Sequence, residues 1–128
     1  MQSLTITKDQ LQEMTAHVES HAPEEACGLL AGKNSTVEKI FFVRNQAQSP
    51  VRFVMDPIEQ LHAFEWIEDN NMELLGIFHS HPAGPEIVSP TDIAEAAYAV
   101  VHVILARVES ERRARGFWIE NGEFREIQ

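Results

Sequence analysis

The sequence is poor in the features that mark several large classes of protein. Its single cysteine, Cys27, excludes an intrachain disulfide framework, and without a signal-like apolar segment the cytoplasm is the expected location. No apolar run approaches the roughly 20 residues of a membrane-spanning helix, so no membrane partner is expected. The chain has 10 basic and 20 acidic residues, a net charge of −10. Nucleic-acid-binding proteins usually carry a basic surface, so no nucleic-acid partner is expected.

Repeats, low-complexity tracts and linkers are absent too, so residues 1–128 are expected to form one domain. Three helices are predicted from start signals: the capping-box pattern Thr7-x-x-Gln10, and the pairs Asp56-Pro57 and Ser89-Pro90. The expected buried face of the first helix is Leu11, Met14 and Val18. The expected buried face of the second is Ile58, Leu61, Phe64 and Ile67. The third helix is expected to be short and to run through Ala94, Ala96 and Ala97.

Strands are predicted where apolar and β-branched residues cluster or alternate. They are expected at 4–6, 27–32, 37–43, 51–54, 74–79 and within 98–108, followed by a hairpin of 116–120 and 123–127 that turns at Asn121-Gly122. The pattern predicts a mixed central sheet flanked by helices, an α/β (α+β) fold.

His79 and His81 are the most informative residues of the chain. On an extended backbone alternate side chains share a face, so both imidazoles project the same way while Ser80 points away. Two imidazoles and one carboxylate make the ligand set of a catalytic zinc that keeps one position open for water. The remaining histidines are expected to be ordinary surface or core residues: His17, His21, His62 and His102.

The tetrapeptide Ser89-Pro90-Thr91-Asp92 allows two interpretations. Taken alone it favours a helix start, with a serine cap, a proline in the first turn and an acid near the positive end of the helix dipole. The second interpretation is a role for Asp92 as the carboxylate beside the imidazoles. It is compatible with the first, because a helix start would fix Asp92 rigidly. The ten residues 82–91 suffice for a loop that returns this carboxylate to the imidazoles.

A metal-bound water also needs a base that takes its proton and hands it to the leaving group. With 20 acidic residues, spacing alone cannot nominate one. Glu24 and Glu25 stand out because they directly precede the buried strand predicted at 27–32. The residues by themselves favour a solvated connection there.

Together these residues resemble the JAMM (MPN+) metalloprotease family, particularly its small prokaryotic members. The family pattern is an upstream glutamate, then His-x-His-Pro, seven residues, Ser, two residues and Asp. Here seven residues separate His81 from Ser89, and two more precede Asp92. The segment 25–32, Glu-Ala-Cys-Gly-Leu-Leu-Ala-Gly, is similar to the family's glutamate segment. The resemblance runs from about Leu4 to Phe124 and implies the MPN/JAMM (cytidine-deaminase-like) fold.

The resemblance implies a role for each residue of the pattern. His79, His81 and Asp92 would be the ligands of Zn²⁺, Glu25 the general acid/base, and Ser89 a hydrogen-bond donor to the oxyanion. The implied enzyme is a zinc metallopeptidase, isopeptidase- or deubiquitinase-like. It would hydrolyse peptide or isopeptide bonds after the C-terminal Gly-Gly tail of ubiquitin-like or sulfur-carrier proteins.

Alternatives remain open at this stage. Cys27 is either an ordinary buried residue or a neighbour that modulates the zinc. A non-catalytic MPN scaffold would lack a ligand, and none is missing, while a zinc hydrolase of a small amide would share the site. Compared with eukaryotic relatives, the chain has no room for the long insertions that read polyubiquitin linkages, so a broad or sulfur-carrier substrate is favoured.

Overall fold

The computed structural model describes residues 3–82, 87–96, 100–108, 111–120 and 122–127. Its elements are α1 (Lys8–His21), β1 (Cys27–Lys33), β2 (Thr36–Val43), α2 (Pro57–Asp69), β3 (Glu73–His81), α3 (Pro90–Glu95), β4 (Val101–Val108), β5 (Glu111–Glu120) and β6 (Glu123–Ile127). The strands form one sheet of order β2-β1-β3-β4-β5-β6. β3 and β4 are parallel and the other neighbouring pairs antiparallel, which confirms the predicted mixed sheet.

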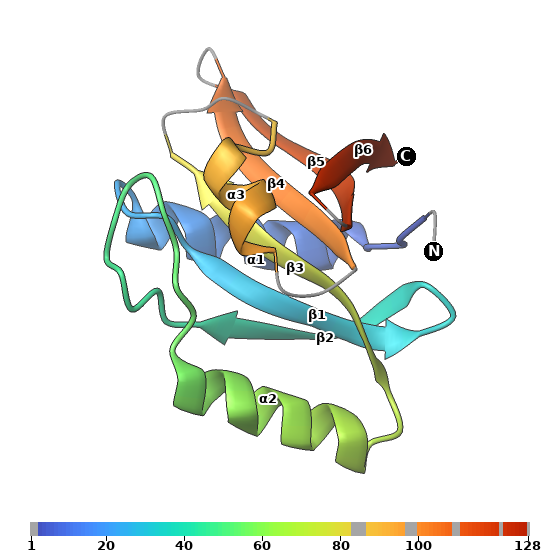
Figure 1. Ribbon diagram of the computed structural model, residues 1–128. Coiled ribbons are helices and arrows are strands. Elements are labelled where there is room, and N and C mark those ends of the chain that lie inside the picture. The colour runs from blue at the N-terminus through green and yellow to red at the C-terminus, as the bar shows by residue number, and fades with distance from the viewer. Residues whose placement is uncertain (1–2, 83–86, 97–99, 109–110, 121, 128) are drawn as a thin grey trace.

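The helices cover both faces of this sheet (Figure 1). α1 packs on one face through Met14 and Val18. α2 contributes Ala63 to a second apolar cluster, and Ile93 of α3 packs against a third. α2 and α3 therefore share the opposite face, where the side chains of His79 and His81 also lie.

A bulge in the sheet adjusts which β3 side chains meet which helix. The pairing of β1 with β3 shifts between Leu30 and Ala31, so one β3 residue, Leu75, is extra. Leu75 and Phe78 both enter the apolar cluster under α1. Beyond the bulge strict alternation resumes, and it turns His79 toward the α2–α3 face.

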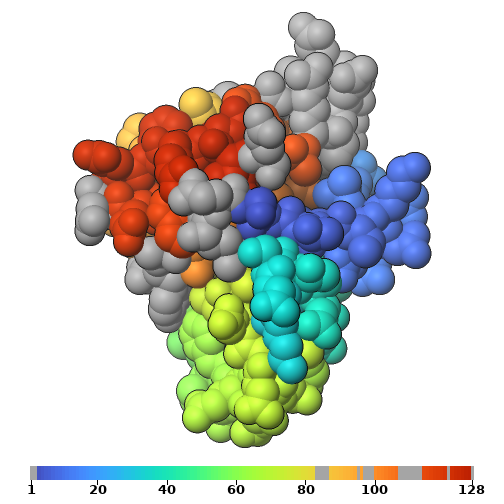
Figure 2. Space-filling view, turned by 90° about the vertical axis from the view of Figure 1, so that its right-hand side faces the viewer, coloured from blue at the N-terminus to red at the C-terminus, as the bar shows by residue number. Residues whose placement is uncertain are grey.

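The N-terminal segment does not form the strand predicted at 4–6. It makes one isolated parallel bridge, between Thr5 and Thr36, and Figure 2 shows the first residues (blue) against the β1–β2 turn (cyan). The segment cannot pair further, because the capping box of Thr7 and Gln10 starts α1 at once. That capping box is confirmed.

The prediction of a strand at 51–54 is also wrong. The backbone groups of Arg52 and Val54 bond to the side chain of Asn45 in place of a neighbouring strand. Asn45 and Met55 form an isolated bridge that closes this segment. The alternating sequence therefore marks a loop, held by the Asn45 side chain and by a hydrogen bond from the Gln46 amide to the Val54 carbonyl at 2.7 Å.

The predicted buried face of α2 is only partly correct. Ile67 is 6% exposed and Phe64 packs on the second apolar cluster, but Ile58 and Leu61 are 65% and 57% exposed. The helix is rotated so that Ala63 meets the sheet. On α1, Met14 and Val18 are buried as predicted, whereas Leu11 lies at the rim and is 36% exposed.

The third helix ends earlier than predicted, at Glu95, and Ala96 is its extended C-cap. The other boundaries are close to those predicted, with one exception. The C-terminal hairpin pairs Glu120 with Glu123, although β5 begins earlier than expected, at Glu111. Asn121, Ala97 and Tyr98 lie outside the described residues. Within the described part of the chain, no helix has the length and apolar character needed to cross a membrane.

Candidate metal centre

The C-terminal end of β3 brings the two predicted imidazoles together. His79 is 0% and His81 5% exposed, and their Nε2 atoms lie 3.0 Å apart. They pair in register with Ile104 and Ala106 on β4, so aliphatic side chains flank the rings. Both point the same way, as strand alternation predicts.

The first turn of α3 supplies the carboxylate. Asp92 Oδ2 lies 3.1 Å from Nε2 of His79 and 3.1 Å from Nε2 of His81. Ser89 caps the helix: its Oγ accepts from the Asp92 amide at 3.0 Å, and its own amide donates to Asp92 Oδ2 at 2.8 Å. The Ser89 cap that starts α3 therefore also holds the Asp92 carboxylate against the two imidazoles.

The three donor atoms form a nearly equilateral triangle, which fits a metal ion. Ligand distances of about 2.0–2.2 Å in a tetrahedral zinc site would separate the donors by about 3.3 Å, a few tenths more than here. Burial lowers the pKa of His79, so its ring is neutral. Burial raises the pKa of Asp92, but hydrogen bonds from His79, His81 and Ser89 outweigh it and leave the pKa well below its usual range. Neutral imidazole and ionised carboxylate are the forms that bind metals.

Glu25 stands beside this triangle, just before β1. One carboxylate oxygen lies within 4.8 Å of ligand atoms of His79 and His81, and the side chain is 3% exposed. Burial raises its pKa to about 7, while His81 lowers it and Asp92 raises it further. A carboxyl group of this kind can both take and give a proton near neutral pH.

Ser80 explains why Glu25 reaches the imidazoles. Its side chain points to the opposite face, where its Oγ accepts from the Ala26 amide at 2.8 Å. Its own amide donates to the Ala26 carbonyl at 2.9 Å. The residue between the two histidines thus locks the residue after Glu25. Glu24 lies elsewhere, in a second cavity with His17 and His21.

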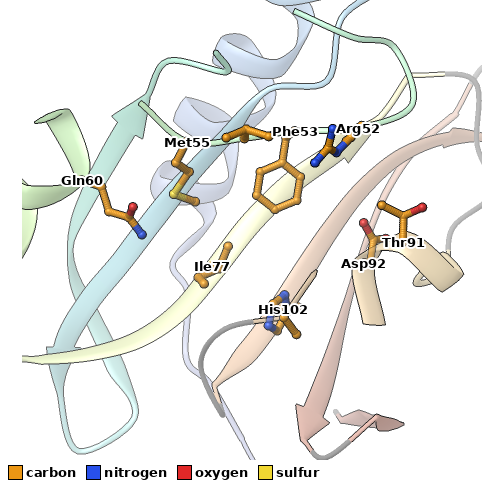
Figure 3. A pocket seen from close by; sticks show the side chains of 10 residues that line it. Arg52, Phe53, Met55, Gln60, Ile77, Thr91, Asp92 and His102 are labelled. Atoms are coloured by element: carbon orange, nitrogen blue, oxygen red, sulfur yellow. The ribbon is translucent and has the colours of Figure 1, made fainter. Parts of the chain in front are cut away.

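A cavity of about 210 Å³ opens next to Asp92 (Figure 3). Phe53 and Met55 form one wall, Thr91 the other, and Ile77 and His102 the floor. Sequence reasoning did not identify Phe53 or His102 as site residues. His102 alternates with Ile104 on β4, which places it on the site face, but only the pairing of β3 with β4 shows that it adjoins Ile77.

Cys27 pairs in register with His79 but does not join the donor atoms. Ligand atoms of Glu25, His79 and His81 all lie within 4.8 Å of one another, and Asp92 reaches both imidazoles at 3.1 Å. Cys27 is buried and donates its thiol to the Val43 carbonyl at 3.4 Å. Burial, followed by Glu25 and Glu59, raises its pKa to about 12. The burial and the hydrogen bond fit an ordinary buried residue, and a modulating role toward a bound zinc stays a prediction.

Comparisons with known proteins agree with this geometry. The family of prokaryotic homologues of the JAB domain matches residues 7–120, so the chain belongs to that family. The matched relatives include a desampylase of Pyrococcus furiosus, 50% identical over 59% of this chain and 54% of its own length. A probable TtuB-protein conjugate cleaving protease of Thermus thermophilus is 39% identical over 79% of this chain and 68% of its own length. A CysO-cysteine peptidase of Mycobacterium tuberculosis is 32% identical over 86% and 77%.

Solved structures show the same fold. A protein from Desulfitobacterium hafniense superposes with a TM-score of 0.86 at 36% identity, covering 98% of this chain and 90% of its own. A JAB1/MPN domain protein from Archaeoglobus fulgidus superposes at 0.65 with 20% identity, covering 98% and 96%. The predicted family and α+β fold are confirmed, and the names of the relatives support the predicted metallopeptidase.

Proposed function

We propose that the protein is a zinc-dependent metallopeptidase. His79, His81 and Asp92 would hold the ion, and the observation that carries the proposal is the convergence of their three donor atoms beside the buried carboxyl group of Glu25. When bound, zinc supplies Lewis-acid chemistry, polarising a carbonyl and lowering the pKa of water. No observation favours the scaffold alternative, since the described site contains every residue of the pattern.

The chain's own residues supply the proton transfers. Glu25 takes a proton from the water that attacks the amide carbonyl and delivers it to the departing amine, a transfer that its pKa of about 7 suits. The Ser89 hydroxyl oxygen accepts from the main-chain amide of Asp92. Its hydrogen is therefore available to donate to the oxyanion. Both roles stay predictions.

For the substrate, we propose a ubiquitin-like or sulfur-carrier protein with a C-terminal Gly-Gly tail, acted on in the cytoplasm. The names of the three relatives support this class. The cavity beside Asp92 offers apolar walls to the residues of an extended tail. Its size suits a few residues and not a folded domain.

The test is cleavage of a Gly-Gly-tailed carrier protein with a short C-terminal extension, using zinc-loaded protein. We expect release of the extension, and loss of cleavage on chelation that added zinc reverses. Cleavage of small amides but of no Gly-Gly extension would instead identify a small-amide hydrolase.

Adjacent glutamates provide a matched pair of variants for the acid/base assignment. Glu25→Gln should lose at least about 100-fold in kcat while it keeps its zinc, because it removes proton transfer and spares the ligands. Glu24→Gln should remain within about twofold of the parent, since Glu24 lies outside the cluster. Near-normal turnover of Glu25→Gln would show that the assigned role is wrong.

A further inference from the structure

Asn45 is a buried amide whose hydrogen bonds join Glu25 to the wall of the cavity. It is 8% exposed, and its Nδ2 donates to the Glu25 carbonyl at 2.9 Å and to the Arg52 carbonyl at 3.1 Å. Its Oδ1 accepts from the amides of Ala47 at 3.0 Å and Val54 at 2.9 Å. Both donor protons and both acceptor lone pairs are in use, so the side chain has one possible orientation.

The segment that contains Asn45 holds the Glu25 peptide from both sides. The Glu25 amide donates to the Ser49 carbonyl at 2.8 Å, and the Glu25 carbonyl accepts from Asn45. The two partners, Asn45 and Ser49, lie four positions apart within one loop. The amide and the carbonyl of Glu25 are therefore both held by the segment 45–55, ahead of the start of β1 at Cys27.

The other end of the same segment reaches the imidazoles and the cavity. Asn45 bonds to the residues on both sides of Phe53, namely Arg52 and Val54. The Phe53 ring stacks on His79, with centroids 4.6 Å apart and planes 26° from parallel. Residues 52–55 all line the cavity. One amide thus links the cavity wall, the aromatic ring over His79 and the peptide of Glu25.

We propose that Asn45 is a positioning residue, which aligns the Glu25 carboxyl group with the segment that a bound substrate contacts. This inference rests on the proposed peptidase function. Asn45 touches neither the donor atoms nor the cavity surface, so it acts through Glu25. A substrate that packs against residues 52–55 contacts the same loop that holds the Glu25 peptide. Binding in the cavity and alignment of the base are thereby coupled.

The isosteric variant Asn45→Asp removes the donor bonds of this side chain and keeps its acceptor bonds. It keeps oxygen acceptors for the amides of Ala47 and Val54 but loses both donors, and it faces the carbonyls of Glu25 and Arg52 with a carboxyl group. On zinc-loaded protein and a Gly-Gly carrier substrate, we expect kcat to fall at least tenfold. KM should stay within threefold, and zinc content should not change.

Asn70→Asp is the matched control, because its amide also donates to a carbonyl, that of Trp66, but at the exposed end of α2. It should keep kcat within twofold. A double-mutant cycle decides how Asn45 acts. Added to Glu25→Gln, Asn45→Asp should cost less than a further twofold, whereas a general structural defect would multiply the two losses.

Three results would overturn the inference: unchanged kcat in Asn45→Asp, loss of its zinc, or multiplied losses in the double variant. If Asn45→Asp does not fold, Asn45→Ser, which keeps one donor, is measured in the same way and should lose several-fold in kcat. Inactivity of the wild-type protein toward every Gly-Gly carrier would refute the proposed function. Activity that Asn45→Asp leaves intact would refute only the role of Asn45.

Discussion

The chain contains two pairs of neighbouring histidines, and only one pair has the surroundings of a metal site. His79 and His81 lie two residues apart on a strand, with ring centroids 4.8 Å apart. His17 and His21 lie four residues apart on α1, with centroids 4.4 Å apart. The distance between ring centroids is thus similar in the two pairs, and it does not distinguish the candidate centre from the helical pair.

The difference lies in what else reaches the ring nitrogens. At β3, Asp92 joins both Nε2 atoms from another element. On α1, Nδ1 of His21 already bonds to the His17 carbonyl at 2.9 Å and to Ser20 Oγ at 3.0 Å. The His17 ring packs against Phe42 at 4.5 Å. A converging carboxylate, and not a second imidazole, therefore marks the candidate centre.

Each pair encloses a serine, Ser80 in β3 and Ser20 in α1, and replacing these serines should give the largest difference between the two pairs. Ser80→Ala leaves the buried Ala26 amide without its partner and should cost about 1–3 kcal/mol of unfolding free energy. Ser20→Ala removes an exposed bond to the His17 carbonyl and should cost at most about 0.5 kcal/mol. Urea unfolding of both variants measures this, and equal losses would show that Ser80 does not lock the site.

A smaller effect is expected from pH at the helical pair. Burial, with a contribution from His21, lowers the pKa of His17 from 6.5 to about 4. The unfolded chain then binds the proton more tightly, so stability is complete above about pH 6.5 and falls as the pH drops toward 4. The loss should be about 1 kcal/mol, because the ring is only partly buried and solvent screens its charge.

His17→Gln should remove this part of the acid sensitivity, and the exposed His62→Gln should not. The measurement is the change in unfolding free energy between pH 7.5 and pH 4.5 for each variant and for the wild-type protein. The contributions of all other groups cancel when the variants are compared with the wild-type protein. Parallel losses in His17→Gln and the wild-type protein would contradict the pKa assigned to His17.

Local patterns predicted much of this structure. The capping boxes at Thr7 and Ser89, and the strand alternation that aligns His79 with His81, depend on neighbouring residues alone. The geometry of the candidate metal centre follows once the Ser89 cap fixes Asp92. Residue roles came from family resemblance, since burial, which separates Glu25 from Glu24, is not visible in two adjacent glutamates.

Failures of prediction occurred where tertiary contacts decide. Val51 to Val54 alternate like a strand, yet the Arg52 carbonyl and the Val54 amide bond to the side chain of Asn45, which lies outside any pattern of spacing. In α2, Ile58 and Leu61 extend the apolar face, but the helix packs through Ala63. Periodicity shows that a face exists, and contacts with the sheet decide its rotation.

The metal content of the purified protein tests the central claim most directly. One tightly bound zinc ion per chain is expected in the wild-type protein and in His17→Ala, whereas His79→Ala should retain almost none after gel filtration. Absence of stoichiometric zinc from the wild-type protein, or equal retention by the two variants, would contradict the assignment of the centre to His79, His81 and Asp92.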